Sequence, residues 1–356
     1  MVSPGKPMRL EPRTESGRSI WIVAPLAAIG ASFLVAAILA LIGGASPFSV
    51  FAAVINGAAG TQFAFLETLT RATPLIFTGL AAAVAFRAKL WNIGAEAQLY
   101  AGAIMTVVLG TGALPLPGPV VIPMIMAAGV MAGALLLLGP TWLKTRFGVD
   151  EVVTTLLLNF VMVLFVSMLL DGVLKDPMGL GWPQSKRVVA DATLPKLVQG
   201  KRLHLGFVIA IGAALVVWFI NARTTFGYEM RAVGFNPRAA RFAGIPVNRV
   251  MAKTALLSGG LAALAGVSEV AGLKGNLTLD LSPGFGYTGI VVAMLAVLHP
   301  IGVIAAAIFV AAMFVGADAM SRTVGVPTYI ANVMVATALL TMVTAMLFTR
   351  FRLRLS

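Results

Sequence analysis

Long apolar runs recur along almost the whole chain, and they restrict the folds that it can adopt. The chain has 356 residues, of which 59% are hydrophobic and 11% are charged, whereas about 25% of the residues of a soluble domain are charged. A helix needs about 20 consecutive apolar residues to cross a bilayer, and many of the runs approach this length. The alternating pattern of strands is absent, which argues against a β-barrel. We therefore predict an all-α polytopic membrane protein.

The apolar runs predict about ten transmembrane helices, some of them broken or re-entrant. The second run is strongly apolar only from Ala72 to Phe86. The eighth and ninth runs are separated only by residues 299–302, so they form either a tight hairpin or one kinked helix. The first run is too long for a signal-peptide core and is read as an uncleaved span. The predicted segments are 20–42, 66–86, 94–112, 119–140, 152–171, 205–221, 251–271, 285–299, 301–320 and 329–348.

The distribution of lysine and arginine predicts the orientation of these helices. Cytoplasmic loops carry an excess of both residues, and most of the 26 in this chain lie on the cytoplasmic side if both termini are inside. The basic residues of the loop Gly172–His204 count against this N-in/C-in arrangement. That loop is either a solvated connector or a landing surface for an extracytoplasmic partner. The predicted regions are cytoplasmic basic tails at 1–19 and 350–356, a transmembrane domain at 20–349, an extracytoplasmic loop at 172–204 and a cytoplasmic loop at 222–250.

A weak internal echo suggests an inverted repeat. Gly79–Ala82 in the second segment and Gly260–Ala263 in the seventh share the letters GLAA. The predicted topology makes these two segments antiparallel, as in the inverted repeats of transporters.

Composition and motifs exclude several kinds of chemistry. The chain has no cysteine, and His204 and His299 are far apart, so no metal-ligand spacing is present. No Walker A motif or catalytic motif occurs, and no catalytic or metal-binding residue is predicted. The net charge of +13 is carried mostly by basic residues at the ends of apolar runs, which suits membrane lipids rather than nucleic acid.

A polar, basic island from Thr224 to Lys253 contains the signals for a very short helix. Asn236 is a good N-cap and Pro237 suits the first helical position. Gly244 suits a left-handed stop, and a proline two residues later prevents the helix from resuming. About two turns of helix are unstable alone in water. This helix therefore has to pack on the rest of the protein, on a partner, or on both.

Polar residues within the apolar runs form a first cluster near the third segment. If this part is helical, Asn92, Glu96 and Tyr100 share one stripe. Gly94 favours a break instead, which would give a discontinuous helix whose end faces a pathway. The alternative is an interfacial turn in which Glu96 caps the helix or pairs with Arg87 or Lys89.

A second cluster begins the fifth segment, and a third ends the seventh. Glu151, Thr155 and Asn159 share one helix face, where they either form interhelical hydrogen bonds or line a pathway. Glu269 and Lys274 form either an outer gate or, more simply, an ion pair.

Four blocks of sequence carry a resemblance to a known family. The chain resembles the permease subunits of ABC importers, in the branch that serves ribose-type sugars and nucleosides, over nearly its whole length. One departure is Ala97, where many relatives have glycine. The blocks are Gly227–Ile245, Leu90–Leu99, Asp150–Asn159, and Gly289–Leu295 with the following His299-Pro300.

The resemblance implies a non-catalytic transport subunit in a bacterial plasma (inner) membrane. It implies four further components: a separate ATPase that binds ATP and Mg²⁺, a second permease that is identical or different, an extracytoplasmic substrate-binding protein, and a nucleoside or simple sugar as substrate. The residues expected to couple to the ATPase are Gly234, Asn236, Pro237, Arg238, Arg241, Phe242 and Gly244. The residues expected to line the substrate pathway are Trp91, Asn92, Glu96, Gln98, Thr155 and Asn159.

Two other functions remain open from the residues alone. An ion-coupled secondary transporter or channel for a small polar solute would need carboxylates at mid-membrane, and only Glu96 and Glu269 come close. A purely structural scaffold does not explain the broken segments or the short cytoplasmic helix.

Overall fold

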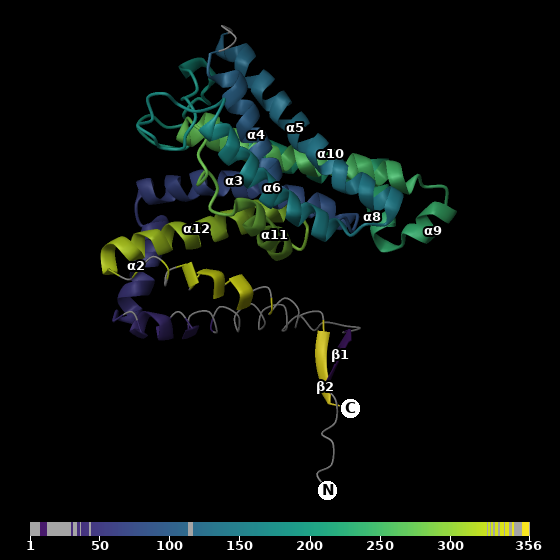
Figure 1. Ribbon diagram of the computed structural model, residues 1–356. Coiled ribbons are helices and arrows are strands. Elements are labelled where there is room, and N and C mark those ends of the chain that lie inside the picture. The colour runs from purple at the N-terminus through teal and green to yellow at the C-terminus, as the bar shows by residue number, and fades with distance from the viewer. Residues whose placement is uncertain are drawn as a thin grey trace. The chain divides into compact units, whose positions relative to one another are not determined.

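The computed structural model consists mainly of helices (Figure 1). It describes residues 8–12, 30, 34–35, 37–42, 44–112, 117–325, 327, 329, 332–333, 335–337, 339–341, 344 and 351–355. The chain divides into two compact units: residues 65–311 form one, and residues 1–64 together with 312–356 form the other.

The larger unit contains most of the helices. They are α3 (Gln62–Arg87, from residue 65), α4 (Ala95–Gly110), α5 (Gly118–Phe147), α6 (Glu151–Asp171), η1 (Ala190–Ala192), α7 (Gly206–Arg223), α8 (Thr225–Phe235), α9 (Pro237–Phe242), α10 (Val247–Val267), the π-helical η2 (Ser268–Lys274), α11 (Phe285–Leu295) and α12 (Pro300–Val324, up to residue 311).

Among the described residues, six helical stretches are long and apolar enough to cross a membrane. They are Gln62–Arg87, Gly118–Phe147, Glu151–Asp171, Gly206–Arg223, Val247–Lys274 and Pro300–Val324. The prediction of a polytopic all-α membrane protein is confirmed. The predicted segments 94–112 and 285–299 form shorter helices, α4 and α11, of 16 and 11 residues. The predicted segment 20–42 lies mostly outside the described residues, and 329–348 lies partly outside them.

The eighth and ninth predicted segments form two helices joined by a tight turn, so the single kinked helix is excluded. Val297 and Leu298 in this turn have φ values of 50° and 58°. Such left-handed conformations are rare for branched side chains, and here they lie in the four residues that separate α11 from α12.

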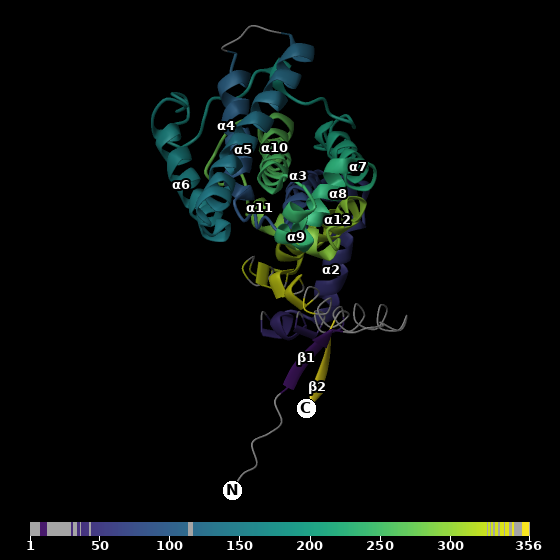
Figure 2. The same cartoon turned by 90° about the vertical axis from the view of Figure 1, so that its right-hand side faces the viewer.

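The backbones of α5 and α10 touch at small residues. A Cβ added to Gly259 would lie 2.3 Å from the carbonyl oxygen of Gly133, and one added to Gly133 would lie 2.4 Å from that of Gly259. Both views show α4, α5 and α10 side by side (Figures 1 and 2). Close approach at small residues is a common way to pack membrane helices.

The helix ends in the larger unit gather at two opposite faces. At one face, Arg87 at the end of α3 donates from Nη2 to the Leu298 carbonyl in the α11–α12 turn (2.9 Å). At the other, the backbone of the 172–204 loop bonds to the end of α4, where Val189 donates to Gly110 (2.8 Å). Gly234, shortly before α10, lies against Arg87 at the end of α3, while Glu67 near the start of α3 and Glu269 after α10 line one cavity. α3 and α10 are therefore antiparallel, whereas the predicted orientation and the inverted repeat stay predictions.

The second unit contains α2 (Pro47–Ala59), the end of α12 and two short strands. β1 (Met8–Pro12) pairs antiparallel with β2 (Phe351–Leu355). Both strands belong to the basic tails, and their pairing requires the two tails to lie on the same side of the membrane. Neither α2 nor the strands were predicted.

Candidate functional site: a surface helix and the polar network behind it

The short helix α9 is capped at both ends by its own sequence. The side-chain oxygen of Asn236 accepts hydrogen bonds from the backbone N–H groups of Arg238 (3.0 Å) and Ala239 (3.1 Å). Gly244 has a φ of +84°, and its N–H donates to Arg241 O (3.1 Å). The N–H of Ile245 donates to the Ala240 carbonyl (3.0 Å), which completes a Schellman motif. The predicted N-cap and left-handed stop are confirmed.

One side of α9 is packed against the protein and the other is open. Ala240 is 4% exposed, whereas Phe242 is 97% exposed. Arg238 and Arg241 are also exposed. An aromatic ring and two guanidinium groups are therefore presented on a helix that is held from behind.

The connection from α9 to the membrane helix α10 is only four residues long. α10 begins at Val247 with Pro246 at its N-cap position. Asn248 does not cap α10, because it lies inside the helix. Proline at position 246 is compatible with the start of α10, because its missing N–H would have no partner within the helix.

A second helix in the loop 222–250, α8, was not predicted. Thr224 caps it by accepting from the N–H of Gly227 (3.1 Å). Near its other end, Gly234 lies so close to α3 that an added Cβ would be 2.0 Å from the Arg87 carbonyl oxygen. α8 therefore connects α9 to the end of α3.

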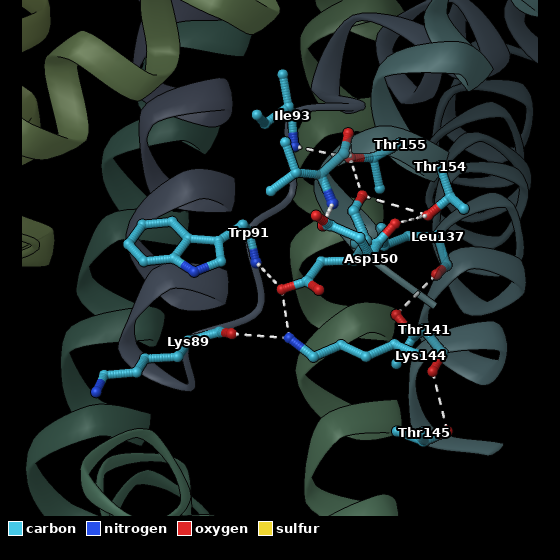
Figure 3. Close-up of polar contacts among 12 residues, drawn as sticks. Lys89, Trp91, Ile93, Leu137, Thr141, Lys144, Thr145, Asp150, Thr154 and Thr155 are labelled. Carbon is cyan, nitrogen blue, oxygen red and sulfur yellow. Dashed lines mark hydrogen bonds and ion pairs between the residues drawn. The ribbon is translucent and has the colours of Figure 1, made fainter. Parts of the chain in front are cut away.

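Figure 3 shows Lys144 beside Lys89 and Trp91 at one face of the unit. The carboxylate of Glu151 joins these segments. Its Oε1 accepts from the Trp91 backbone N–H (3.1 Å) and forms an ion pair with Lys144. The ammonium of Lys144 also donates to the Lys89 carbonyl (3.1 Å). The Glu151 side chain is 7% exposed and that of Lys144 is 27% exposed. The ends of α3, α5 and α6 are thus tied by one buried charge.

Residues 88–94 form a non-helical break between α3 and α4, and Asn92 holds it from inside. Asn92 is fully buried. Its Nδ2 donates to Gln98 Oε1 (2.9 Å) and Ser258 Oγ (3.0 Å), and its Oδ1 accepts from Gly94 N (3.0 Å). The predicted break at Gly94 is confirmed. The alternative of a continuous stripe through Asn92, Glu96 and Tyr100 is wrong, because Asn92 lies outside the helix.

Side chains of α6 complete the support of this break. Thr155 Oγ1 accepts from the Ile93 N–H (3.2 Å). Asn159 accepts from Ala97 N (2.9 Å) and donates to Ile93 O (3.0 Å) and the Tyr287 hydroxyl (2.9 Å). Thr155 and Asn159 were predicted either to form hydrogen bonds between helices or to line a pathway. The structure shows that they form such hydrogen bonds.

Glu96 has a different partner from those predicted. Its Oε2 accepts from the N–H of Gly286 at the start of α11 (2.6 Å), where a helix N-terminus favours an anion. The predicted pairing with Arg87 or Lys89 is not formed: Arg87 contacts a backbone carbonyl instead.

Of the six predicted pathway residues, five are buried and one is open. Trp91 is 42% exposed, and its ring lies 4.7 Å from that of Phe86. The other five are less than 9% exposed; they are Asn92, Glu96, Gln98, Thr155 and Asn159. The sequence analysis did not select Ser258 and Tyr287, because their roles depend on partners far away in the chain.

The opposite face of the unit carries a small charged cavity of about 260 Å³. Glu67 pairs with Arg202 at its edge (2.9 Å), and Glu269 is 2% exposed. Lys274 donates to the backbone oxygen of Asp280 (2.7 Å). Within the part of the chain that the structure describes, the predicted Glu269–Lys274 ion pair is not formed, because Lys274 turns to this carbonyl.

Comparison with known proteins identifies the family. The family described as "Branched-chain amino acid transport system / permease component" matches residues 64–352. The chain belongs to this family. It is 35% identical to the glucose ABC transporter permease protein TsgB13 of Haloferax volcanii, covering 82% of this chain and 79% of that one. It is 35% identical to the guanosine ABC transporter permease protein NupP of Bacillus subtilis, covering 77% and 79%. It is 32% identical to the nucleoside ABC transporter permease protein NupB of Lactococcus lactis, covering 78% and 79%.

The predicted resemblance and transport class are therefore confirmed. This chain is a multi-pass ABC transporter permease, the translocation subunit of an importer. One of these relatives is named for glucose and two are named for nucleosides, so membership of the family does not identify the substrate of this chain.

Proposed function

We propose that this chain imports a nucleoside across a bacterial plasma membrane, coupled through α9 to a separate ATPase. A simple sugar is the alternative substrate. A second permease, identical or different, completes the pathway, and an extracytoplasmic binding protein delivers the substrate. The observation that carries the coupling role is α9: a helix capped at both ends, open on one side, and four residues from α10.

The chemistry of α9 suits a protein partner. Phe242 exposes nearly its whole ring, and a buried aromatic anchor is typical of binding hot spots. Arg238 and Arg241 provide planar donors for carboxylates or backbone carbonyls. The caps stabilise the helix ends, so that the element can move as a rigid rod.

Motion of α9 has a contiguous route into the membrane part. α10 follows it directly, and Gly234 of α8 lies against the Arg87 carbonyl. Arg87 in turn bonds to the turn before α12. Displacement of the rod would therefore act on α3, α10 and α12 through direct contacts.

The pathway is proposed to pass beside the break at residues 88–94. Trp91 and Tyr287 are 42% and 41% exposed and lie next to the buried network. An aromatic face suits the base of a nucleoside. Asn92, Glu96, Gln98, Thr155 and Asn159 would form the wall that positions these two rings.

The coupling role is tested with an Arg238→Gln/Phe242→Ala double variant. Because these side chains are exposed, the variant should insert into the membrane normally. It should lose most binding of the ATPase and nearly all substrate-stimulated ATP hydrolysis. Co-purification of the ATPase and the hydrolysis rate in proteoliposomes are measured.

The matched control also removes one arginine and one aromatic residue, but from the opposite face. An Arg187→Gln/Trp182→Ala variant changes two exposed side chains of the 172–204 loop and should leave co-purification of the ATPase intact. Wild-type coupling in the α9 variant would contradict the proposal.

The substrate is tested by uptake of labelled guanosine and adenosine against ribose and glucose. The measurement uses cells that carry the whole transporter, with cells lacking the permease as the background. A preference for either nucleoside is expected. Preferential uptake of ribose or glucose would reject the nucleoside proposal and retain the importer class.

A further inference from the structure

A groove between the cytoplasmic ends of α5 and α10 is not explained by coupling or transport. Its volume is about 610 Å³, within the range of about 300–1,000 Å³ that is usual for ligand sites. Its apolar part is lined by Leu138, Gly139 and Trp142 of α5 and by Ala252 of α10. A Cβ added to Gly139 would meet no atom within 4 Å, so the groove is open at this position.

The polar part of the groove lies nearer to the cytoplasm. It is lined by Arg146 on one side and by Asn248 and Arg249 on the other. The predicted apolar spans of the two helices end at residue 140 and begin at residue 251, so all three polar residues lie beyond the hydrocarbon region. From Leu138 to Arg146 a helix rises about 12 Å. The groove therefore changes from apolar to basic along the membrane normal.

Neither arginine of the groove is neutralised within the described residues. No acidic side chain lies within 4 Å of Arg146 or Arg249 there, whereas the neighbouring Lys144 is paired with Glu151. Both arginine side chains are exposed. Two guanidinium groups that line one groove make it attractive to an anion.

Trp142 marks the boundary between the two parts. It is 58% exposed and stacks edge-on against Phe147, with ring centroids 5.2 Å apart. Tryptophan is enriched at the membrane–water interface, where its ring lies at the level of the headgroups. With the predicted orientation, Trp142 indicates that the groove lies at the cytoplasmic interface.

We propose that the α5–α10 groove is a binding site for an anionic phospholipid. The phosphate lies between Arg146 and Arg249, with Asn248 as an additional donor. An acyl chain lies over Gly139 and Trp142. Basic pockets between helices on the cytoplasmic side bind such headgroups, and guanidinium groups recognise phosphate through paired hydrogen bonds.

Retention of lipid by the purified chain tests the proposal. The protein is exchanged into nanodiscs that contain phosphatidylcholine with a small fraction of phosphatidylglycerol, and bound lipid is counted by native mass spectrometry after release. The wild type should retain phosphatidylglycerol in preference to phosphatidylcholine. Each basic residue near an anionic lipid contributes about fivefold in affinity. The Arg146→Gln/Arg249→Gln variant should therefore bind phosphatidylglycerol about thirtyfold more weakly.

A second variant tests the apolar half without removing a charge. Gly139→Leu places a side chain in the open groove and should reduce retention of phosphatidylglycerol severalfold. Gly212→Leu on α7 is the matched control, because a Cβ there also meets no atom within 4 Å. It should bind lipid as the wild type does.

The control for general charge is Arg238→Gln/Arg241→Gln, which removes two exposed arginines from α9 on the same face. It should retain phosphatidylglycerol. Equal loss in this variant, or unchanged retention in both groove variants, would overturn the proposal. If the groove variants lose the ATPase and keep the lipid, the groove binds a protein instead and the proposal also fails.

Discussion

Glu151 is a buried carboxylate on α6 whose partners lie on α5 and in the break that follows α3. It binds Lys144 and the backbone of Trp91, and Lys144 also holds the Lys89 carbonyl. A second carboxylate, Glu67, pairs with Arg202 at a more exposed site, with side chains 23% and 57% exposed. The two pairs differ mainly in burial, and burial decides what an ion pair contributes to stability.

Replacing Glu151 should cost much more than replacing Glu67. Glu151→Ala leaves the Trp91 N–H without an acceptor and Lys144 without its counter-ion, and an unsatisfied buried donor costs about 1–3 kcal/mol. Glu67→Ala removes an exposed pair worth less than about 1 kcal/mol. Thermal unfolding of the purified variants in detergent measures both. Equal losses would show that Glu151 does not tie the helix ends together.

His204, at the end of the 172–204 loop, should make the stability of the fold depend on pH. It is fully buried, and its Nδ1 accepts from the N–H of Gly206 (3.2 Å). Burial, with a smaller effect from the charge of Lys196, lowers the pKa of His204 to about 4. An unfolded chain takes up this proton near the ordinary pKa of about 6.5. The folded protein therefore loses stability as the pH falls from about 6.5 to about 4.

A His204→Asn variant keeps an acceptor for Gly206 and removes the titration. Its melting temperature should fall less than that of the wild type between pH 7 and pH 4. Parallel curves for the two proteins would show that His204 takes up a proton in the folded state as readily as in the unfolded chain. Differential scanning fluorimetry over this pH range gives the comparison.

Contacts between neighbouring residues could be predicted from the sequence, whereas contacts between distant residues could not. The caps of α9 are local, because Asn236 bonds to residues two and three positions away, and local signals are readable. The network around Asn92 depends on Ser258, which is 166 positions away. The pattern of apolar residues carries no information about such a pair. The predicted Glu269–Lys274 ion pair was wrong for a different reason: Lys274 donates to the nearby backbone oxygen of Asp280 instead.

Among the elements, α8 is the link between the surface helix and the membrane helices. Its sequence, TFGYEMRAVGF, mixes polar and apolar residues and contains two glycines, which obscures the helical period. α2 was missed for another reason: with 13 residues it is too short to be recognised as a span. α4 and α11 were found by their composition, but their shortness depends on the break at residues 88–94 and on the turn at residues 296–299 that follows α11.

Gly234 tests the contact between α8 and α3. In Gly234→Ala the new Cβ would lie 2.0 Å from the Arg87 carbonyl oxygen, so α8 has to shift. We expect a loss of about 1–3 kcal/mol of stability, as for overpacking, and a larger proportional loss of uptake. The matched variant is Gly148→Ala at the end of α5. Gly148 has a φ of +72° and no atom near the added Cβ, so only local strain of about 1–2 kcal/mol is expected. Uptake that is equal in both variants would contradict a role for the α8–α3 contact.

At the scale of the whole chain, we expect the 172–204 loop and α9 to lie on opposite sides of the membrane. Leu180 on the 172–204 loop is fully exposed, and Phe242 on α9 is 97% exposed. The chain contains no cysteine, so single Leu180→Cys and Phe242→Cys variants carry one thiol each. A membrane-impermeant maleimide should label the first variant in spheroplasts and the second only after permeabilisation. The reverse pattern would invert the predicted N-in/C-in orientation.

The same Phe242→Cys variant tests whether α9 contacts the ATPase. Inside-out vesicles that carry the whole transporter are treated with a short bifunctional reagent that reacts with thiols and amines. If α9 contacts the ATPase, Phe242→Cys should give a cross-linked product of the permease and the ATPase subunit. Leu180→Cys should give none. Absence of this product from Phe242→Cys, in vesicles that still hydrolyse ATP in response to substrate, would contradict the account.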